Sequence, residues 1–173
     1  MQEVILVNEQ DEQIGTMEKL RAHKEGLLHR AFSVFLFNDK NEMLLQQRAA
    51  TKYHSPNLWT NACCSHPIPG ENLEDATVRR LKEELGINHV ETKKKFSFIY
   101  KSVFENGLTE YELDHVFTGI FNKLPEINPE EASAYRFISV ENLNKEIAKS
   151  PESFTTWFKI ALPLLIEKIE TLA

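Results

Sequence analysis

The sequence contains little cysteine, and this argues against a fold held by disulfides. It has two cysteines among 173 residues, and they are adjacent, at Cys63 and Cys64. Neighbouring Cα atoms lie about 3.8 Å apart across a trans peptide, whereas a disulfide prefers about 4.4–6.8 Å. We therefore expect two free thiols, for which burial as a small hydrophobic residue is the ordinary role.

The sequence also lacks long apolar runs and a positive net charge. Its N-terminus, MQEVILVNEQDEQIG, reaches charged residues too early for a signal peptide, and no apolar run approaches the length that spans a bilayer. A net charge of -6 disfavours broad attraction to nucleic acid or anionic membranes. We expect a cytoplasmic monomer with no nucleic-acid or membrane partner, in which a local basic pocket holds any bound anion.

Hydrophobic patterning predicts both strands and helices. Apolar segments that predict strands lie at 4–8, 31–38, 43–48 and 112–121, and turn sequences lie at 38–42 and 105–107. The strongest helix is predicted over 72–86, with Asn72 as N-cap and Gly86 as terminator. Further helices are expected near 140–148 and from about 153, where Pro163 must kink or restart the second. These elements predict one mixed α/β domain.

Cys64 and His66 lie two positions apart in NACCSHP, residues 61–67. In an extended strand, side chains at i and i+2 share a face, so these two project together while Cys63 points the opposite way. A buried thiol beside an incidental histidine is one interpretation, and a functional pair is the other. We expect the two cysteines to have different roles.

Acidic side chains alternate in TEYELDH, where Glu110, Glu112 and Asp114 fall on one face of a strand. Such a row is costly unless water or a cation neutralises it, so it indicates either a solvated hairpin edge or a metal site. His23 and His29 each suit a surface or polar-core position when taken singly. The combined set suits Zn²⁺, Mn²⁺ or a related ion, and comprises His23, His29, His66, Glu110 and Glu112.

The helix predicted over 72–86 pairs Arg79 with Glu83, and Arg80 with Glu84, at a spacing of four. A solvated face of ion pairs would account for them. The cation precedes the anion, however, which is the poorer order, and the carboxylates crowd the negative end of the helix dipole. This arrangement favours a bound cation.

Basic residues also occur at Lys19, Arg48 and Lys52. In an acidic protein they suit a phosphate or diphosphate site, although solvated loops explain them equally well. Trp157 lies at helical spacing from neighbouring apolar residues, for which core packing is the favoured interpretation.

Residues 65–87 resemble a Nudix box, Gly-x5-Glu-x7-Arg-Glu-hydrophobic-x-Glu-Glu-x-Gly-hydrophobic, whose helix binds divalent cations beside a diphosphate. The matching residues are Glu71, Arg79, Leu81, Glu83, Glu84, Gly86 and Ile87. Ser65 replaces the first glycine, and Arg80 replaces a glutamate that Nudix hydrolases use for metal binding and catalysis. The second replacement argues against hydrolysis.

A degenerate box preceded by NLWTNACCSHP and followed by TEYE resembles the type 1 isopentenyl-diphosphate Δ-isomerases, metal-dependent enzymes built on the Nudix fold. The similarity runs from LVNEQDEQIGTMEKLRAH through HRAFSVFLFN to FTTWF, nearly the whole chain. It implies an α/β single-domain Nudix-type fold over residues 1–173, with a mixed β-sheet packed between helices.

The resemblance also implies roles for matching positions. The family's metal ligands fall on His23, His29, His66, Glu110 and Glu112. Its catalytic thiol falls on Cys64, its acidic partner on Glu112, and its pocket aromatics on Tyr100 and Trp157. A substrate-borne Mg²⁺ would use Glu84 and the main-chain carbonyl of Cys64. Diphosphate contacts fall on Lys19, Arg48, Lys52, Ser65 and Arg80.

The implied reaction interconverts isopentenyl and dimethylallyl diphosphate, in isoprenoid biosynthesis, through a tertiary carbocation. The implied cofactors are Mg²⁺ and one further divalent metal, Mn²⁺ or Zn²⁺. Two other functions remain as alternatives: a Nudix hydrolase of a nucleoside diphosphate derivative, and a noncatalytic binding module stabilised by metal.

Overall fold

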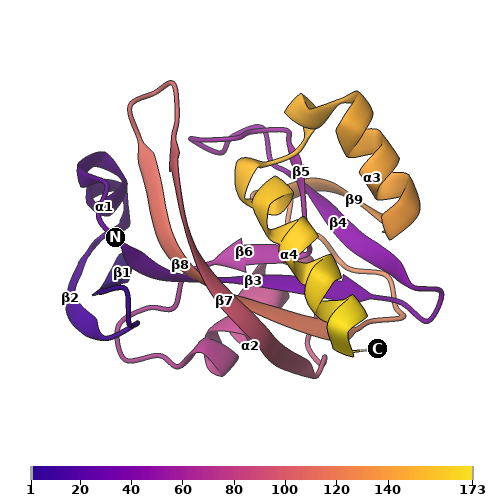
Figure 1. The fold of residues 1–173 in the computed structure, drawn as a ribbon, viewed down its shortest axis with the longest axis horizontal. Helices are drawn as coiled ribbons and strands as arrows, with labels where there is room; N and C mark the ends of the chain where they lie inside the picture. The colour runs from indigo at the N-terminus through magenta and orange to yellow at the C-terminus, as the bar shows by residue number, and fades with distance from the viewer. Residues whose placement is uncertain (1, 173) are drawn as a thin grey trace.

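A computed structural model describes residues 2–172 and shows a mixed β-sheet with helices on both of its faces (Figure 1). The strands are β1 (Glu3–Val7), β2 (Gln13–Glu18), β3 (His29–Phe37), β4 (Glu42–Arg48), β5 (Trp59–Thr60), β6 (Cys63–Ser65), β7 (Thr92–Val103), β8 (Thr109–Ile120) and β9 (Ala132–Ser139). The helices are α1 (Lys19–Glu25), α2 (Leu73–Leu85), α3 (Val140–Lys149) and α4 (Thr156–Leu172), and a 3-10 turn occupies Pro151–Ser153.

Strand β3 lies between two strands that carry sequence-predicted site residues, β6 and β8. It runs parallel to β8, with His29 opposite Glu112, and antiparallel to β6, with Ser33 opposite Cys64. Strand β8 also pairs with β7 in the antiparallel hairpin whose tip was predicted at 105–107. Three segments far apart in sequence therefore lie side by side as β6, β3 and β8.

Alternation along the strands separates two cores, which we call the α2 face and the α4 face. On β3, Val34 packs on the α2 face and Phe35 packs on the α4 face. Residues contributed to the α2 face by its helix are Ala76, Leu81 and Leu85; those contributed to the α4 face are Trp157, Phe158, Ala161, Leu162 and Leu165. Burying both sides of the sheet in this way confirms the predicted mixed sheet between helices.

Helix α2 has the caps that the sequence predicted. The Asn72 side chain accepts a hydrogen bond from the Asp75 N–H at 2.8 Å, and Gly86 ends the helix in the left-handed region with φ 63°. A Cβ at Gly86 would lie 2.8 Å from the Glu126 carbonyl oxygen, so a side chain is excluded there. These caps fix the rotation of α2 and the direction of its charged residues.

The sequence analysis did not predict β2, α1, β5 or β9, and it gave no bounds for β7. Helix α1 has seven residues, too few for a helical period to emerge. It depends instead on its ends: the Glu18 carboxylate accepts from the N–H groups of Leu20 and Arg21, and Gly26 adopts φ 65°. Local capping, rather than an apolar stripe, therefore positions Lys19 and His23.

Helix α4 begins at Thr156 rather than near 153, and of the two outcomes expected at Pro163, a kink or a restart, the restart does not occur. The helix continues through this proline, which is exposed. On either side of Pro163, Leu162 and Leu165 pack on the α4 face and hold the helix against the sheet. Within the described residues, no helix combines the length and apolar character needed to cross a bilayer.

Candidate active site

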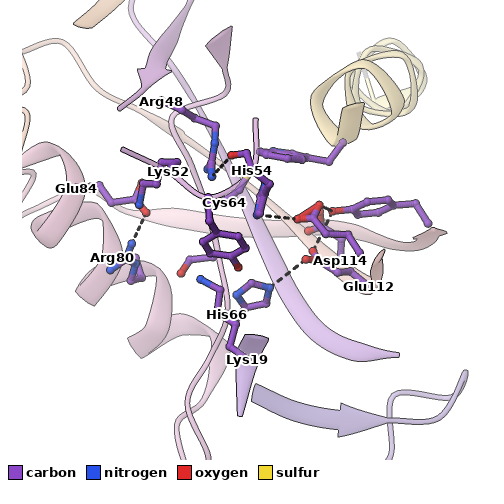
Figure 2. Close-up of a pocket in the computed structure, with 15 residues that line it drawn as sticks. Lys19, Arg48, Lys52, His54, Cys64, His66, Arg80, Glu84, Glu112 and Asp114 are labelled. Atoms are coloured by element: carbon purple, nitrogen blue, oxygen red, sulfur yellow. Dashed lines mark hydrogen bonds and ion pairs between the residues drawn. The ribbon is translucent and has the colours of Figure 1, made fainter. Parts of the chain in front are cut away.

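A cavity of about 70 Å³ opens on the α4 face (Figure 2). Its lining residues are Lys19, Arg48, Lys52, Tyr53, His54, Cys64, Ser65, His66, Arg80, Glu84, Tyr100, Glu110, Glu112, Asp114 and Trp157. In Figure 2, Arg80 and Glu84 enter from helix α2, Glu112 and Asp114 enter from the opposite side, and Cys64 lies between them. All the proposed catalytic and diphosphate-binding residues meet here. The remaining two sequence-predicted ligands, His23 and His29, belong to the buried histidine cluster beside this cavity.

The two cysteines separate as strand alternation predicted. Cys63 is fully buried in the α2 core, whereas Cys64 lines the cavity. The Cys64 Sγ donates to Asn61 Oδ1 at 2.9 Å and lies 3.3 Å from Ser33 Oγ. Burial raises the pKa of the Cys64 thiol, and the charge of Asp114 raises it further. Cys64 is therefore a protonated thiol at neutral pH.

His23, His29, His66 and Glu112 form a buried cluster whose candidate ligand atoms all lie within 4.8 Å of one another. The Nε2 atoms of His23 and His29 are buried and have no hydrogen-bond partner. His29 uses its Nδ1 at 2.9 Å from the Leu27 carbonyl, which leaves Nε2 free to bind a metal. Figure 2 shows the hydrogen bond between His66 Nε2 and Glu112 Oε1, which is 3.0 Å long.

Burial favours the neutral forms of His23 and His66. It lowers the pKa of His23 to about 3, with the neighbouring His66 and His29 adding to the effect. Burial also lowers the pKa of His66 to about 4, although Glu112 acts in the opposite direction. Neutral imidazoles and one carboxylate are the donor set that a divalent transition metal prefers, and the orphaned nitrogen atoms fit such an ion.

The acidic row on β8 is buried, which excludes a solvated hairpin edge. Glu110, Glu112 and Asp114 are 4%, 5% and 2% exposed. The Tyr100 hydroxyl lies 3.0 Å from both Glu110 Oε1 and Glu112 Oε2. Burial and the charge of Glu112 raise the pKa of Glu110, whereas His66 and His29 hold the pKa of Glu112 well below its usual range despite burial. The surroundings therefore shift the pKa values of these two neighbouring carboxyls in opposite directions.

Glu110 lies at the edge of the cluster rather than in the group of four. Its second oxygen, Oε2, is 3.4 Å from His54 Nε2. His54 and Tyr53 line the cavity and were missed by the sequence analysis, although both follow Lys52 directly in the sequence. The His54 ring stacks on Phe104 at 5.2 Å. An aromatic wall therefore surrounds this end of the site.

Trp157 belongs to both the core and the cavity. It is 3% exposed, and the core packing favoured from its helical spacing is confirmed. Its ring also forms part of the cavity wall, 5.7 Å from the ring of His54. The Arg48 guanidinium lies 5.2 Å from the ring centroid, within the range of a cation–π contact.

Four cations gather around one end of the cavity: Lys19, Arg48, Lys52 and Arg80. Burial lowers the pKa of Lys19, and the charges of Lys52, Arg80 and Arg48 lower it further. Such crowding is unfavourable without anions. Glu131, which the sequence analysis missed, forms ion pairs with both Lys52 and Arg80 and supplies part of the compensating charge.

The two arginines of α2 bind carboxylates in different places: Arg80 binds within the helix beside the cavity, and Arg79 binds a residue of the loop before the helix. Arg80 binds Glu84 at 2.6 Å, as the spacing predicted, and Glu84 also accepts from the buried Gln46 amide at 2.8 Å. Arg79 binds Glu71 through two hydrogen bonds of 2.8 and 2.9 Å, and it also lies 3.4 Å from Glu83, the partner that the spacing predicted. Arg79 therefore fastens the loop before α2, while Arg80 and Glu84 face the cavity.

The chain matches the NUDIX domain family model over residues 27–158, so it belongs to the Nudix family. The solved structure of DR0079 from Deinococcus radiodurans is similar, with a TM-score of 0.71, 25% identity, and coverage of 85% of this chain and 89% of that one.

Comparison with curated proteins identifies the group of Nudix proteins to which the chain is similar. The isopentenyl-diphosphate Delta-isomerase 2 of Photorhabdus laumondii is 50% identical, with 90% of this chain and 88% of that protein covered. The isopentenyl-diphosphate Delta-isomerase of Pectobacterium atrosepticum is 47% identical, with 91% and 88% covered. The chain belongs to the isopentenyl-diphosphate Delta-isomerase family.

Proposed function

We propose that the enzyme interconverts isopentenyl diphosphate and dimethylallyl diphosphate, with Cys64 and Glu112 as the two proton-transfer groups. The observation that carries this proposal is the single cavity into which the thiol, the Glu112 carboxylate and four cations all point. Membership of the isomerase family supports the substrate class. The geometry supports proton transfer at a carbon chain whose diphosphate is held at the basic end.

Moving a double bond along a five-carbon chain requires a proton to be added at one carbon and removed from another. Carbon atoms are poor proton partners, so both groups must be positioned closely. Cys64 from β6 and Glu112 from β8 approach the cavity from different strands. Tyr100 would hold the Glu112 carboxylate through its 3.0 Å hydrogen bond.

Protonation of the alkene gives a tertiary carbocation, which water would trap. The aromatic wall would exclude water from this centre. We assign the stabilising π face to Trp157, because an aromatic ring attracts a cation without acting as a nucleophile.

The buried cluster is suited to a divalent metal, for which we propose Mn²⁺ or Zn²⁺. His23, His29, His66 and Glu112 would hold it, with Glu110 as an additional ligand. The metal would supply a fixed positive charge that orients the carboxylates and favours their ionised forms. We further assign a substrate-borne Mg²⁺ to Glu84 and the main-chain carbonyl of Cys64, where it would neutralise part of the diphosphate charge.

The diphosphate would displace the carboxylate partners of the cavity cations. Lys19, Arg48, Lys52 and Arg80 would contact its oxygens, together with Ser65. Arg80 occupies the position of a glutamate used for metal binding and catalysis by the Nudix hydrolases that the box resembles. A guanidinium binds phosphate but does not activate water, so this replacement suits an enzyme that leaves the ester intact.

The test is incubation of the protein with isopentenyl diphosphate and Mg²⁺ in heavy water. We expect dimethylallyl diphosphate that carries deuterium, with no release of orthophosphate. Release of phosphate, or turnover of a nucleoside diphosphate derivative alone, would identify a hydrolase. Thermal stabilisation by metal without turnover of either substrate would identify a binding module.

A further inference from the structure

A chain of buried polar side chains joins the thiol to the start of helix α4, which carries Trp157. The Thr155 hydroxyl donates to Thr60 Oγ1 at 3.0 Å, and the Thr60 hydroxyl donates to Asn61 Oδ1 at 2.9 Å. The Cys64 thiol donates to the same Asn61 oxygen at 2.9 Å. These hydrogen bonds are shielded from solvent, since Thr155, Thr60 and Asn61 are 0%, 2% and 0% exposed.

The orientation of Asn61 is fixed by its own hydrogen bonds. Its Nδ2 donates to the carbonyl oxygens of Val34, at 2.9 Å, and Cys63, at 3.0 Å. Both amide hydrogens are therefore used on the backbone of β3 and β6, which leaves the side-chain oxygen directed at the thiol and at Thr60. A flipped amide would lose both backbone bonds and place its NH₂ group against the two donors.

The backbone reinforces the same connection. The Thr155 N–H donates to the Trp59 carbonyl at 3.0 Å, and Trp59 forms a parallel bridge with Phe154. Helix α4 begins at the next residue, and Trp157 follows one residue later. Strand β5 is thus bound to the segment that leads into α4 and is separated from β6 by only two residues.

We propose that Thr60, Thr155 and Asn61 are positioning residues that hold the Cys64 thiol in register with the Trp157 ring. This inference rests on the proposed function, in which the thiol exchanges a proton with the substrate and the ring faces the resulting cation. Both groups must meet the same five-carbon chain, yet they come from segments about ninety residues apart in the sequence. The hydroxyl and amide series is a hydrogen-bonded side-chain link between those segments, and its described contacts include neither the four cavity cations nor the histidine cluster.

The test compares isosteric variants that remove or keep one hydroxyl. Thr60→Val and Thr155→Val each delete a donor with little change in shape, whereas Thr60→Ser and Thr155→Ser keep the donor. We expect each valine variant to lower kcat about 10-fold, because a small displacement of reacting groups is costly, while KM stays within about twofold. Each serine variant should recover most of the lost kcat.

A second readout separates this inference from the proposed function. The alkylation rate of Cys64 by iodoacetamide, measured by mass spectrometry of its peptide, reports the freedom of the thiol without any turnover. It should change in Thr60→Val, which frees Asn61 of its competing donor, and return towards the wild-type rate in Thr60→Ser. The double valine variant should have a kcat only slightly lower than that of either single variant, because each single substitution already interrupts the same series of hydrogen bonds.

The outcomes are distinct. Equal kcat in the valine and serine variants at both positions, or a loss of kcat that follows the loss of thermal stability, would overturn the positioning role even if the isomerase activity is confirmed. Thr60→Ala and Thr155→Ala delete the same hydroxyls and replace any valine variant that does not fold. A wild-type protein without isomerase activity would overturn the proposed function instead. The alkylation rates would still decide whether the hydrogen-bonded side chains of Thr155, Thr60 and Asn61 position the thiol.

Discussion

The two faces of the short strand β6 have opposite character, although adjacent residues supply them. On the α2 face, Cys63 is packed among apolar side chains that include Ala62 and Leu81. On the α4 face, Cys64 contacts the polar groups of Asn61 and Ser33 beside the cavity. Identical side chains thus pack in an apolar core on one face and line a polar cavity on the other, because only the direction of the side chain differs.

This comparison shows how the fold supports a buried polar site. The α2 face fills its space with apolar atoms and keeps β3 and β6 in place. The α4 face contains buried carboxylates and histidines next to the half-buried cations of the cavity, and the unfavourable burial of these groups is offset by mutual contacts and by the proposed ligands. The apolar α2 face therefore stabilises the fold, while the polar face holds the cavity to which we assign binding and proton transfer.

The largest expected effect is at the thiol. Cys64→Ala should lower turnover by about 10³-fold, the usual contribution of a positioned acid or base, with a small change in thermal stability. Cys63→Ala should leave the turnover of the folded enzyme close to that of the wild type and cost on the order of 1 kcal/mol of unfolding free energy, through a small cavity. Steady-state kinetics and thermal unfolding of both variants test the contrast. The reverse pattern would show that the two faces are assigned wrongly.

Metal binding should be the next largest effect and should be confined to the α4 face. A metal at about one hundred times its dissociation constant should stabilise the wild type by about 2.7 kcal/mol, and a chelator should remove this gain. His29→Asn removes one ligand and should abolish the response to Mn²⁺ or Zn²⁺. His89, which is exposed, provides the control variant His89→Asn. Thermal unfolding and metal analysis measure the response to added metal. If His29→Asn is stabilised by the metal as much as the wild type, the assigned cluster is wrong.

Within the α4 face, the basic end should affect substrate affinity rather than folding. Lys52→Met removes one charge-assisted contact worth about 1.5–3 kcal/mol, so KM for isopentenyl diphosphate should rise about 10- to 100-fold. The Glu131 carboxylate would then keep Arg80 as its partner. Lys40→Met, in the exposed turn between β3 and β4, is the matched control. A KM that does not change in Lys52→Met would remove Lys52 from the diphosphate site.

The contacts that the sequence predicted are those set by local geometry. Period-two alternation placed Cys64 with His66, and it placed the acidic row of β8 on one face, because a strand fixes these directions without reference to the rest of the chain. Helix α2 was predicted with its caps for the same reason. The resemblance to a family added the convergence of His23 and His29 on that row, which spacing alone did not establish.

The contacts that were missed join distant parts of the chain. Glu131 reaches Lys52 across 79 positions, and Thr155 reaches Thr60 across 95. No local pattern marks such partners, because a single threonine or glutamate is compatible with many surface positions. The sequence also left open whether α4 kinks or restarts at Pro163, because the core packing of Leu162 and Leu165 that accompanies the continuous helix is not a local property of the proline.

The smallest expected effect concerns a titratable group on the other side of β8, where His115 shares the strand face of Phe117. His115 is 2% exposed, and its Nε2 lies 3.0 Å from Asp11 Oδ2, beside Arg30. Burial and the charge of Lys94 lower the pKa of His115 to about 4, although Asp11 acts in the opposite direction. The folded protein therefore holds this imidazole neutral at a pH where the unfolded chain binds a proton.

The sign of the resulting pH dependence follows from proton linkage. Between the unfolded pKa of about 6.5 and the folded value of about 4, the unfolded chain binds more protons, so stability falls as the pH is lowered through this window. One such histidine contributes at most about 1.4 kcal/mol per pH unit. His115→Asn should therefore reduce the slope of unfolding free energy against pH between 6 and 5, measured by urea denaturation with a chelator present. The exposed His89→Asn should keep the wild-type slope, and equal slopes in all three proteins would show that His115 is not held neutral by the fold.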